Sequence, residues 1–326
     1  MTEVLRVDDL RTHFHTRAGV VKAVDGLSFS LAKGEILGLV GESGSGKTVT
    51  GFSLLGLVDA PGRIVSGSIR LNGEELVGMS ERELRRRRGR DISMIFQDPI
   101  ATLNPMLSIG VQMRLALDAH ERLGRKAAEA RCAELLTRVG IPSARARLNA
   151  YPHEFSGGMR QRVAIAIALL HGPSVIVADE PTTALDVSIQ AQILWQMRDL
   201  ARETGAAMIW ISHDLAVVSS LASRLLVMYA GRVVEEGPTA QVLRDPRHPY
   251  SAGLLASLPA ASRPGMPLAQ VPGTTPSLLS LPPGCPFAPR CARVAEVCAT
   301  APEMTRAEGR GWRCARPLSR EIGAPA

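Results

Sequence analysis

The segment GESGSGKT at residues 41–48 constrains the fold of this chain more than any other feature. It fits the phosphate-loop pattern G-x-x-x-x-G-K-[ST], in which glycines let the backbone turn so that several N–H groups face one anion. The apolar string ILGLV at residues 36–40 precedes it, and a helical pattern at residues 49–57 follows it. A glycine-rich turn with an incidental lysine would not need this context. The order of strand, loop and helix therefore predicts a site for a nucleotide triphosphate.

Each residue type in this loop has a chemical reason to be there. Lys47 adds a point charge between the β- and γ-phosphates, and Thr48 offers a hydroxyl to Mg²⁺. The pattern thus predicts ATP and Mg²⁺ as ligands. The residues expected to hold the nucleotide in this loop are Gly41, Ser43, Gly44, Ser45, Gly46, Lys47 and Thr48.

Two further apolar strings, at residues 174–178 and 207–211, resemble central parallel strands that are covered on both faces. Ligands of open α/β sheets bind beyond the carboxyl ends of such strands. Asp179 follows the first string and is expected to anchor Mg²⁺, and the adjacent Glu180 is placed to orient or deprotonate the attacking water. The alternative is a helix cap. His213 follows the second string and could hydrogen-bond the γ-phosphate, or it could be purely structural.

Composition divides the chain into parts. Residues 1–258 alternate apolar strings with helical patterns, except for residues 98–159, which we interpret as a helical insert. Residues 259–326 hold 12 of the 22 prolines and four of the five cysteines, so they are interpreted as a small, loop-rich appended module. We therefore expect an α/β domain over 1–258 and a cysteine-bearing extension over 259–326.

Charge and hydropathy exclude some classes of protein. The net charge is +7, but its one cluster, Arg85 to Arg88 with Arg90, is best interpreted as a solvated helix face, with a membrane-surface role as the next alternative. Aromatic residues make up only 4% and none lies within this cluster, which argues against nucleic-acid binding. An uninterrupted apolar run of about 18 residues is absent, and the N-terminus lacks a secretory pattern. The composition favours a cytosolic chain with no span of its own.

The segment FSGGMRQR at residues 155–162 resembles the signature of ATP-binding cassette (ABC) ATPases. Other parts of that family follow the same order here. Gln97 resembles the glutamine that joins the core to the helical insert, residues 183–186 resemble the loop at the dimer interface, and His213 resembles the switch histidine. Phe14 resembles the aromatic residue that stacks on adenine, with His15 as a neighbouring candidate. The resemblance covers residues 4–256.

Further motifs narrow the resemblance. The segments QDP at 97–99, LNP at 103–105, YPHEF at 151–155 and HPY at 248–250 are similar to the ATPase subunits of peptide and nickel importers. The cysteine-bearing tail is similar to the C-terminal extension of that subfamily. The resemblance implies an ATPase that drives uptake of dipeptides or oligopeptides. Import of nickel or another small solute is the alternative, and an exporter ATPase is a more distant one.

The same resemblance implies a mechanism. Two ATPase subunits, identical or paralogous, pack head to tail, so that the phosphate loop of one chain and Ser156, Gly157 and Gly158 of the other hold each γ-phosphate. Asp186 lies at this interface, Gln97 contributes to the Mg²⁺ site, and ATP closes the dimer until hydrolysis loosens it. The partners implied are two transmembrane permeases and an extracytoplasmic solute-binding protein, with no nucleic acid. The implied location is peripheral, on the cytoplasmic face of the cell membrane.

Four cysteines of the extension are separated by gaps of five, six and fifteen residues: Cys285, Cys291, Cys298 and Cys314. A cytosolic location argues against disulfides, and the absence of a C-x₂₋₄-C pair argues against a typical zinc site. Spacing alone leaves an iron–sulfur cluster, zinc or no ligand open. The resemblance implies a [4Fe–4S] cluster. Cys132, within a helical pattern, is interpreted as ordinary packing.

Overall fold

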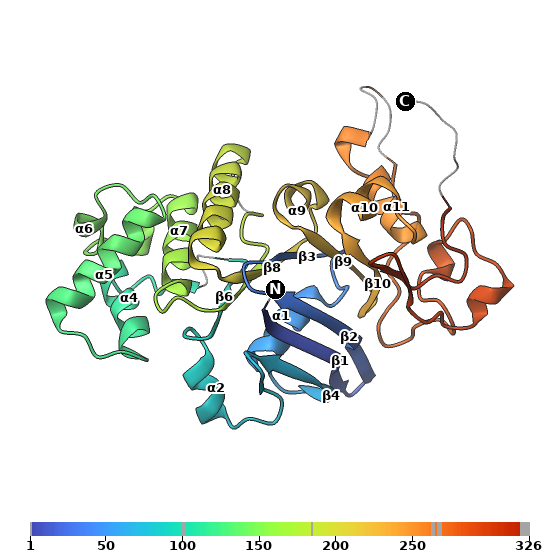
Figure 1. The fold of residues 1–326 in the computed structure, drawn as a ribbon, viewed down its shortest axis with the longest axis horizontal. Coiled ribbons are helices and arrows are strands. Elements are labelled where there is room, and N and C mark those ends of the chain that lie inside the picture. The colour runs from blue at the N-terminus through green and yellow to red at the C-terminus, as the bar shows by residue number, and fades with distance from the viewer. Residues whose placement is uncertain (1, 99–101, 184, 262–264, 266–268, 320–326) are drawn as a thin grey trace. The chain divides into compact units, whose positions relative to one another are not determined.

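A computed structural model of the chain describes residues 2–98, 102–183, 185–261, 265 and 269–319 (Figure 1). The chain divides into two compact units, which are described separately. Unit 1 comprises residues 1–5, 30–35 and 70–209, and unit 2 comprises residues 6–29, 36–69 and 210–326. Over the ranges described, none of the helices has both the length and the apolar character that crossing a membrane requires.

Strand β3 (Ile36–Val40) of unit 2 is buried along its whole length, as the apolar string predicts. It pairs in parallel with β9 (Arg224–Tyr229), with Leu37 opposite Arg224 and Val40 opposite Val227. Gly38 lets helix α9 (Leu215–Leu221) approach β3, because a Cβ there would lie 2.2 Å from Cγ1 of Val218. The described part of unit 2 also contains the α-helices α1 (Lys47–Leu55), α10 (Thr239–Arg244) and α11 (Pro249–Ala256).

The C-terminal part of unit 2 extends this sheet. Three antiparallel strands continue from β9 in the order β10 (Arg232–Pro238), β12 (Arg310–Trp312) and β11 (Thr305–Ala307). The side chain of Glu235 on β10 is fully buried, and its Oε1 lies 3.0 Å from Nη2 of Arg310. Its other oxygen accepts a hydrogen bond of 2.9 Å from the backbone N–H of His248. This buried ion pair anchors the C-terminal segment, drawn in orange to red, to the sheet.

The predicted boundary between residues 258 and 259 lies inside unit 2 and stays a prediction. Short 3₁₀ turns follow it at Pro259–Ala261, Ala288–Arg290 and Glu296–Ala299. A second sheet contains β2 (Gly19–Ala32), β1 (Glu3–Thr16) and β4 (Gly62–Leu71) in that order, and most of each strand belongs to unit 2.

Two strands that are buried along their whole length form the sheet core of unit 1. They are β6 (Ile92–Ile95) and β7 (Val175–Asp179), which pair in parallel from Ile92 opposite Val175 to Ile95 opposite Ala178. Strand β8 (Ala207–Ser212) begins in unit 1 and ends in unit 2. The short strand β5 (Glu74–Glu75) pairs with the end of β4.

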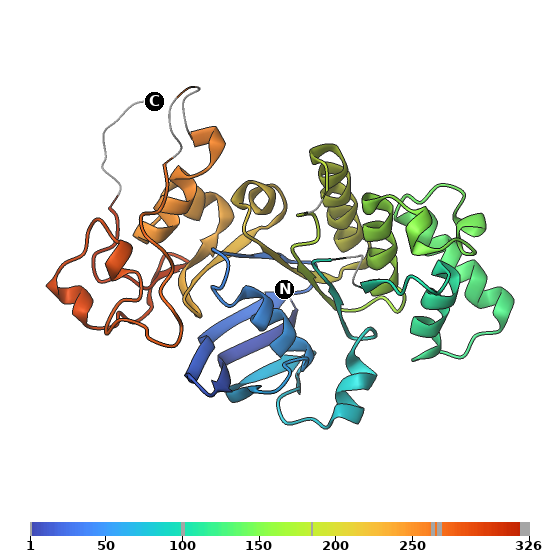
Figure 2. The ribbon, with the colours of Figure 1, turned by 180° about the vertical axis from the view of Figure 1, so that it is seen from behind.

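Helices make up much of the remainder of unit 1 and appear as one green group in both views (Figures 1 and 2). They include α4 (Ile109–Asp118), α5 (Arg125–Arg138), α6 (Ala144–Arg147), a 3₁₀ turn at Pro152–Glu154 and α7 (Gly157–Ala168). Helix α8 (Val187–Thr204) follows β7. The described part of the predicted insert is thus helical, whereas residues 99–101 lie outside the described ranges. Cys132 is buried within α5, in agreement with its interpretation as packing.

The arginine cluster lies on and just after helix α2 (Glu81–Arg87). Ser80 and Glu83 form a capping box at its start. Arg87 pairs with Asp91 at 2.8 Å and Arg88 pairs with Glu81 at 2.6 Å. The cluster therefore forms a charged helix face with its own acidic partners.

Candidate phosphate-binding and hydrolytic site

The predicted phosphate loop runs from the end of β3 to the start of α1, which begins at Lys47. Two of its glycines have a positive φ angle and press against backbone carbonyls. A Cβ at Gly41 would lie 2.3 Å from the carbonyl oxygen of Met228, and one at Gly46 would lie 2.2 Å from that of Ala23. Only glycine fits these two positions, so the close packing of the loop explains why residues 41 and 46 are glycines.

Lys47 supplies the positive charge of the loop. Its side chain is buried, and Nζ donates hydrogen bonds to the carbonyl oxygens of Gly41 at 2.8 Å and Glu42 at 3.0 Å. Thr48 stands next to it in the first turn of α1. A buried ammonium group at the N-terminus of a helix, within a turn of glycines, makes this loop suited to a phosphate group.

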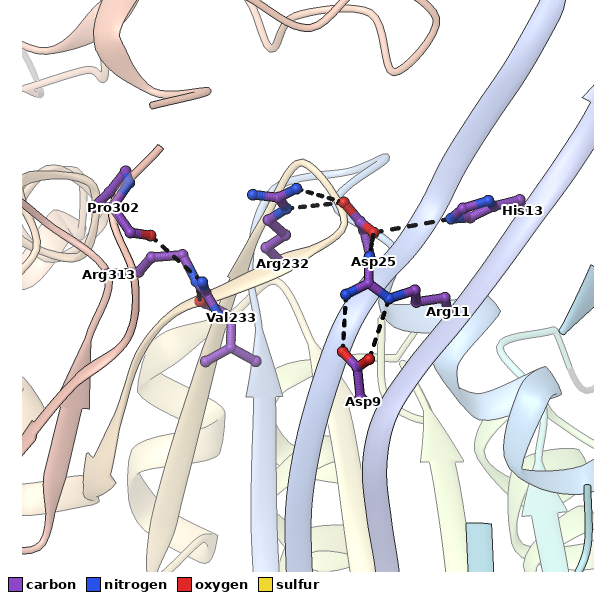
Figure 3. A network of polar contacts seen from close by, with 8 residues as sticks. All are labelled: Asp9, Arg11, His13, Asp25, Arg232, Val233, Pro302 and Arg313. Carbon is purple, nitrogen blue, oxygen red and sulfur yellow. Dashed lines mark hydrogen bonds and ion pairs between the residues drawn. The ribbon is translucent and has the colours of Figure 1, made fainter. Parts of the chain in front are cut away.

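A network of charged side chains surrounds Asp25 (Figure 3). Asp25 on β2 is buried, and its two oxygens accept hydrogen bonds from Arg11 at 2.9 Å and from Arg232 at 2.6 Å. The backbone N–H of Asp25 donates to the carbonyl of Gly231, whose own N–H donates to the carbonyl of Ser45 in the loop at 3.0 Å. The network thereby holds the β9–β10 turn against the phosphate loop.

Electrostatics explain why Asp25 carries a charge inside the protein. Burial by itself would raise the pKa of this carboxyl group. The hydrogen bonds from Arg232 and the charges of Arg232 and Arg11 outweigh that effect, so the pKa of Asp25 is lowered. His13 lies 3.9 Å from the same carboxylate, and burial lowers the pKa of its imidazole.

In unit 1, the polar side chains of Gln97 and Thr183 both contact the side chain of Glu180. Asp179 is buried as the last residue of β7, and Glu180 follows it with a φ angle of 45°. Its Oε2 accepts hydrogen bonds from Nε2 of Gln97 at 3.1 Å and from Oγ1 of Thr183 at 3.0 Å. A non-glycine residue in this backbone region is uncommon and is often found at functional sites. The carboxylate is therefore held in one orientation at the end of a buried strand.

The predicted signature segment begins helix α7 in unit 1. Ser156 is its exposed N-cap, and the serine hydroxyl accepts a hydrogen bond of 3.4 Å from the backbone N–H of Met159. A Cβ at Gly158 would lie 2.7 Å from Cγ2 of Ile189 on α8, which explains the glycine there. Asp186 is the exposed N-cap residue of α8, and Ala184 of the same predicted loop lies outside the described residues.

Two further predicted residues belong to unit 2. His213 is exposed directly after β8, and Asp214 beside it caps α9 by accepting a hydrogen bond from the N–H of Ala216 at 2.8 Å. Phe14 on β1 is half-buried, and its ring lies so close to Gly62 that a Cβ there would be 2.5 Å from the ring carbon Cε1. The neighbouring His15 is exposed.

The four cysteines of the C-terminal segment line a single pocket together with His248, Phe287 and other residues. The backbone N–H of Cys285 donates to the carbonyl of Cys298 at 2.9 Å. Burial raises the pKa of the Cys285 and Cys314 thiols. Within the described ranges, no three His, Cys, Asp or Glu side chains are arranged so that they could hold a metal ion.

Sequence reasoning missed one set of contacts at the loop. Arg290 and Tyr250 from the C-terminal part of unit 2 both bind Glu42, although they are 248 and 208 positions away along the chain. The HPY segment at residues 248–250 indicates only the subfamily, and no sequence pattern pairs Arg290 with Glu42. Such a pairing depends on the tertiary structure.

Comparisons with known proteins agree with this geometry. A family model described as ABC transporter matches residues 24–183, and one described as oligopeptide/dipeptide transporter, C-terminal region, matches residues 234–298. The chain is 48% identical to the oligopeptide transport ATP-binding protein OppD of Escherichia coli, over 97% of this chain and 94% of that protein. It is also 48% identical to the dipeptide transport ATP-binding protein DppD of Bacillus subtilis, over 91% and 89%.

Solved structures resemble the fold as well. The dimeric ATP-binding cassette MJ0796, in a post-hydrolysis state bound to ADP and Pi, matches with a TM-score of 0.65 at 24% identity, over 72% of this chain and 98% of that chain. CbiO1 from Clostridium perfringens, described as part of the transporter complex cbiONQ, matches with a TM-score of 0.64 at 25% identity, over 75% and 92%. These likenesses confirm the predicted α/β phosphate-loop fold.

Proposed function

Because the chain belongs to the ABC transporter family of ATP-binding proteins, we propose that it is the ATP-hydrolysing subunit of an importer for dipeptides or oligopeptides. The observation that carries this proposal is the 48% identity, over nearly the whole length, to proteins named for oligopeptide transport. The match of residues 234–298 to the oligopeptide/dipeptide transporter C-terminal region supports the same substrate class. We also propose the domain division at residue 258 and a peripheral location on the cytoplasmic face of the membrane.

In the proposed reaction, the phosphate loop binds ATP, and Glu180 with its neighbours Gln97 and Thr183 activates the attacking water. Lys47 would exchange the carbonyls of Gly41 and Glu42 for phosphate oxygens when ATP binds. The hydroxyl of Thr48, the buried carboxylate of Asp179 and the amide of Gln97 are oxygen donors that suit Mg²⁺, which would neutralise phosphate charge. Glu180 accepts the proton of the attacking water, and its hydrogen bonds from Gln97 and Thr183 hold the carboxylate in place.

A second ATPase subunit would complete the site. The exposed Ser156 at the N-terminus of α7, with Gly157 and Gly158, offers a hydroxyl and backbone N–H groups to the γ-phosphate bound by the partner. His213 would bond to the γ-phosphate held by the phosphate loop of its own chain, Asp186 would lie at the interface, and Phe14 would stack on adenine. ATP then favours the closed dimer, and its hydrolysis releases it. Two permeases and a solute-binding protein are the further partners that this function requires.

Reconstitution tests the proposed substrate class. The ATPase is assembled in vesicles with the permeases encoded next to its gene, and the matching binding protein is supplied with either peptides or nickel chelates. We expect peptide-loaded binding protein to stimulate ATP hydrolysis several-fold and to drive peptide uptake. Stimulation by nickel chelates but not by peptides would contradict the proposal.

We further propose that Cys285, Cys291, Cys298 and Cys314 hold a [4Fe–4S] cluster. Four thiols around one pocket supply the donor set of such a cluster, which uses four cysteine thiolates. Within the described residues, no three of these side chains have the arrangement that a metal ion needs. We therefore expect the thiols to change position when the cluster binds. The cluster would act as a structural crosslink in a segment with little core of its own.

Metal analysis tests the cluster. Protein purified without oxygen is expected to contain about four iron atoms per chain and to absorb light at about 400 nm. Replacing Cys298 by alanine should remove the iron and the absorbance. The matched control is Cys132→Ala, which removes another buried thiol, from α5, and should leave both unchanged. One zinc per chain with no iron would reject the cluster in favour of a zinc site.

A further inference from the structure

The second residue of the phosphate loop, Glu42, forms a bidentate ion pair with Arg290 of the C-terminal segment. Nη1 of Arg290 lies 2.6 Å from Oε2 of Glu42, and Nη2 lies 3.0 Å from Oε1. The side chain of Arg290 is 5% exposed and that of Glu42 is 27% exposed. Paired hydrogen bonds between a guanidinium and a carboxylate fix both distance and orientation.

Other contacts fix Arg290 independently of Glu42. Its Nε donates a hydrogen bond of 2.8 Å to the carbonyl of Pro272. The guanidinium carbon also lies 5.8 Å from the ring centre of Tyr229 and 6.0 Å from that of Phe287, within the range of a cation–π contact. The position of Arg290 is therefore fixed by these contacts, and its guanidinium in turn fixes the side chain of Glu42.

Glu42 is also held through its main chain and by a second side chain. Its backbone N–H donates to the hydroxyl oxygen of Tyr250 at 2.8 Å, and its carbonyl oxygen accepts from Nζ of Lys47 at 3.0 Å. Oγ1 of Thr275 donates to the carboxylate at 2.8 Å. The hydrogen bonds from Arg290 are the main reason why the pKa of Glu42 is lowered, so this carboxylate carries its charge at neutral pH.

A negative charge in a loop that must receive a triphosphate is unfavourable unless a cation compensates it. The described contacts assign that compensation to Arg290, which also draws the carboxylate toward the C-terminal segment. Removing the guanidinium would leave an ionised carboxylate in the phosphate loop with no arginine to neutralise it. The side chain of Glu42 would also lose the paired contact that fixes its orientation, although its backbone N–H would still be held by Tyr250.

We propose that Arg290 is a positioning residue for nucleotide binding, which neutralises Glu42 and holds it in the arrangement that admits the triphosphate. This inference rests on the proposed ATPase function. It assigns to the C-terminal segment a direct effect on the affinity of the phosphate loop for ATP. Arg290 exerts this effect through Glu42.

The experiment is a double-mutant cycle in the full-length chain assembled with its partner subunits. We compare the parent with Arg290→Met, Arg290→Lys, Glu42→Gln and the double variant, and we measure the Kd of ATP together with KM and kcat. Arg290→Met should raise the Kd and KM about tenfold and change kcat little, because it introduces an uncompensated charge. Arg290→Lys should show a smaller loss, because lysine keeps the charge but lacks the paired geometry.

The double variant provides the decisive result. Glu42→Gln in the Arg290→Met background should restore the Kd to within about threefold of the parent, because the uncompensated charge is gone. Raising the salt concentration should likewise reduce the loss in Arg290→Met alone. A merely structural role for Arg290 would show no such rescue, and the absence of rescue would overturn the proposal.

Arg310→Met is the matched control, since it removes another arginine–glutamate pair of the same segment, one in which both side chains are buried. It should lower the Tm but leave the Kd of ATP within about twofold of the parent, because Glu235 lies outside the loop. An equal loss of affinity in both arginine variants would reject the special role of Arg290. A parent chain that neither binds nor hydrolyses ATP would instead reject the proposed function.

Discussion

Replacing Lys47 by alanine is expected to abolish ATP binding. The substitution removes the buried ammonium that would bond to the phosphates, and it leaves the carbonyls of Gly41 and Glu42 without their donor. Charge-assisted bonds to two phosphate groups together contribute about 3–6 kcal/mol, so the Kd of ATP should rise at least about a hundredfold. Equilibrium binding of a fluorescent ATP analogue measures the change.

The matched control for this variant is Lys126→Ala. Lys126 is an exposed lysine on α5, and its removal should leave both affinity and stability unchanged. The Tm of Lys47→Ala is measured alongside, so that lost binding is distinguished from lost fold. Unchanged ATP affinity in a folded Lys47→Ala chain would contradict the assignment of the phosphate loop.

Glu180→Gln is expected to bind ATP but to hydrolyse it about 100 to 10,000 times more slowly, which is the range for loss of a general base. Glutamine keeps the size of the side chain, and its amide oxygen can still accept the hydrogen bonds from Gln97 and Thr183. The geometry should therefore survive while the proton acceptor is lost. Single-turnover hydrolysis measures the rate, and light scattering should show a dimer that persists in ATP.

Glu203→Gln serves as the control for this second variant, because Glu203 is an exposed glutamate of the same unit. It should turn over ATP at the rate of the parent. Hydrolysis by Glu180→Gln at the parental rate would show that another group activates the water.

Apolar strings predicted the central strands closely, and the ends of those strands differ by about one residue. The apolar string predicts a strand over residues 174–178, whereas β7 runs from Val175 to Asp179. Backbone pairing continues through a residue whose side chain is polar, so the first polar residue does not mark the end of a strand. The phosphate loop could be predicted because glycine, lysine and threonine are all required within eight adjacent positions.

Contacts between distant positions were beyond prediction. Asp25 and Arg232 form an ion pair across 207 positions, and each would pass for an ordinary surface charge in the sequence. The composition of the C-terminal segment predicts a loop-rich module, yet the segment adds strands β11 and β12 to the sheet of unit 2. Strands of three residues have too little pattern to be recognised, and they form because β10 offers them a partner.

The pairing of β12 with β10 matters for anyone who shortens this protein. Without residues 310–312, β10 would expose a row of backbone donors and acceptors that invites pairing with another molecule. Glu235 would at the same time lose the guanidinium that balances its charge. A shortened protein that lacks β12 would therefore tend to self-associate during expression. A poor yield of that protein would not show that the removed residues take part in catalysis.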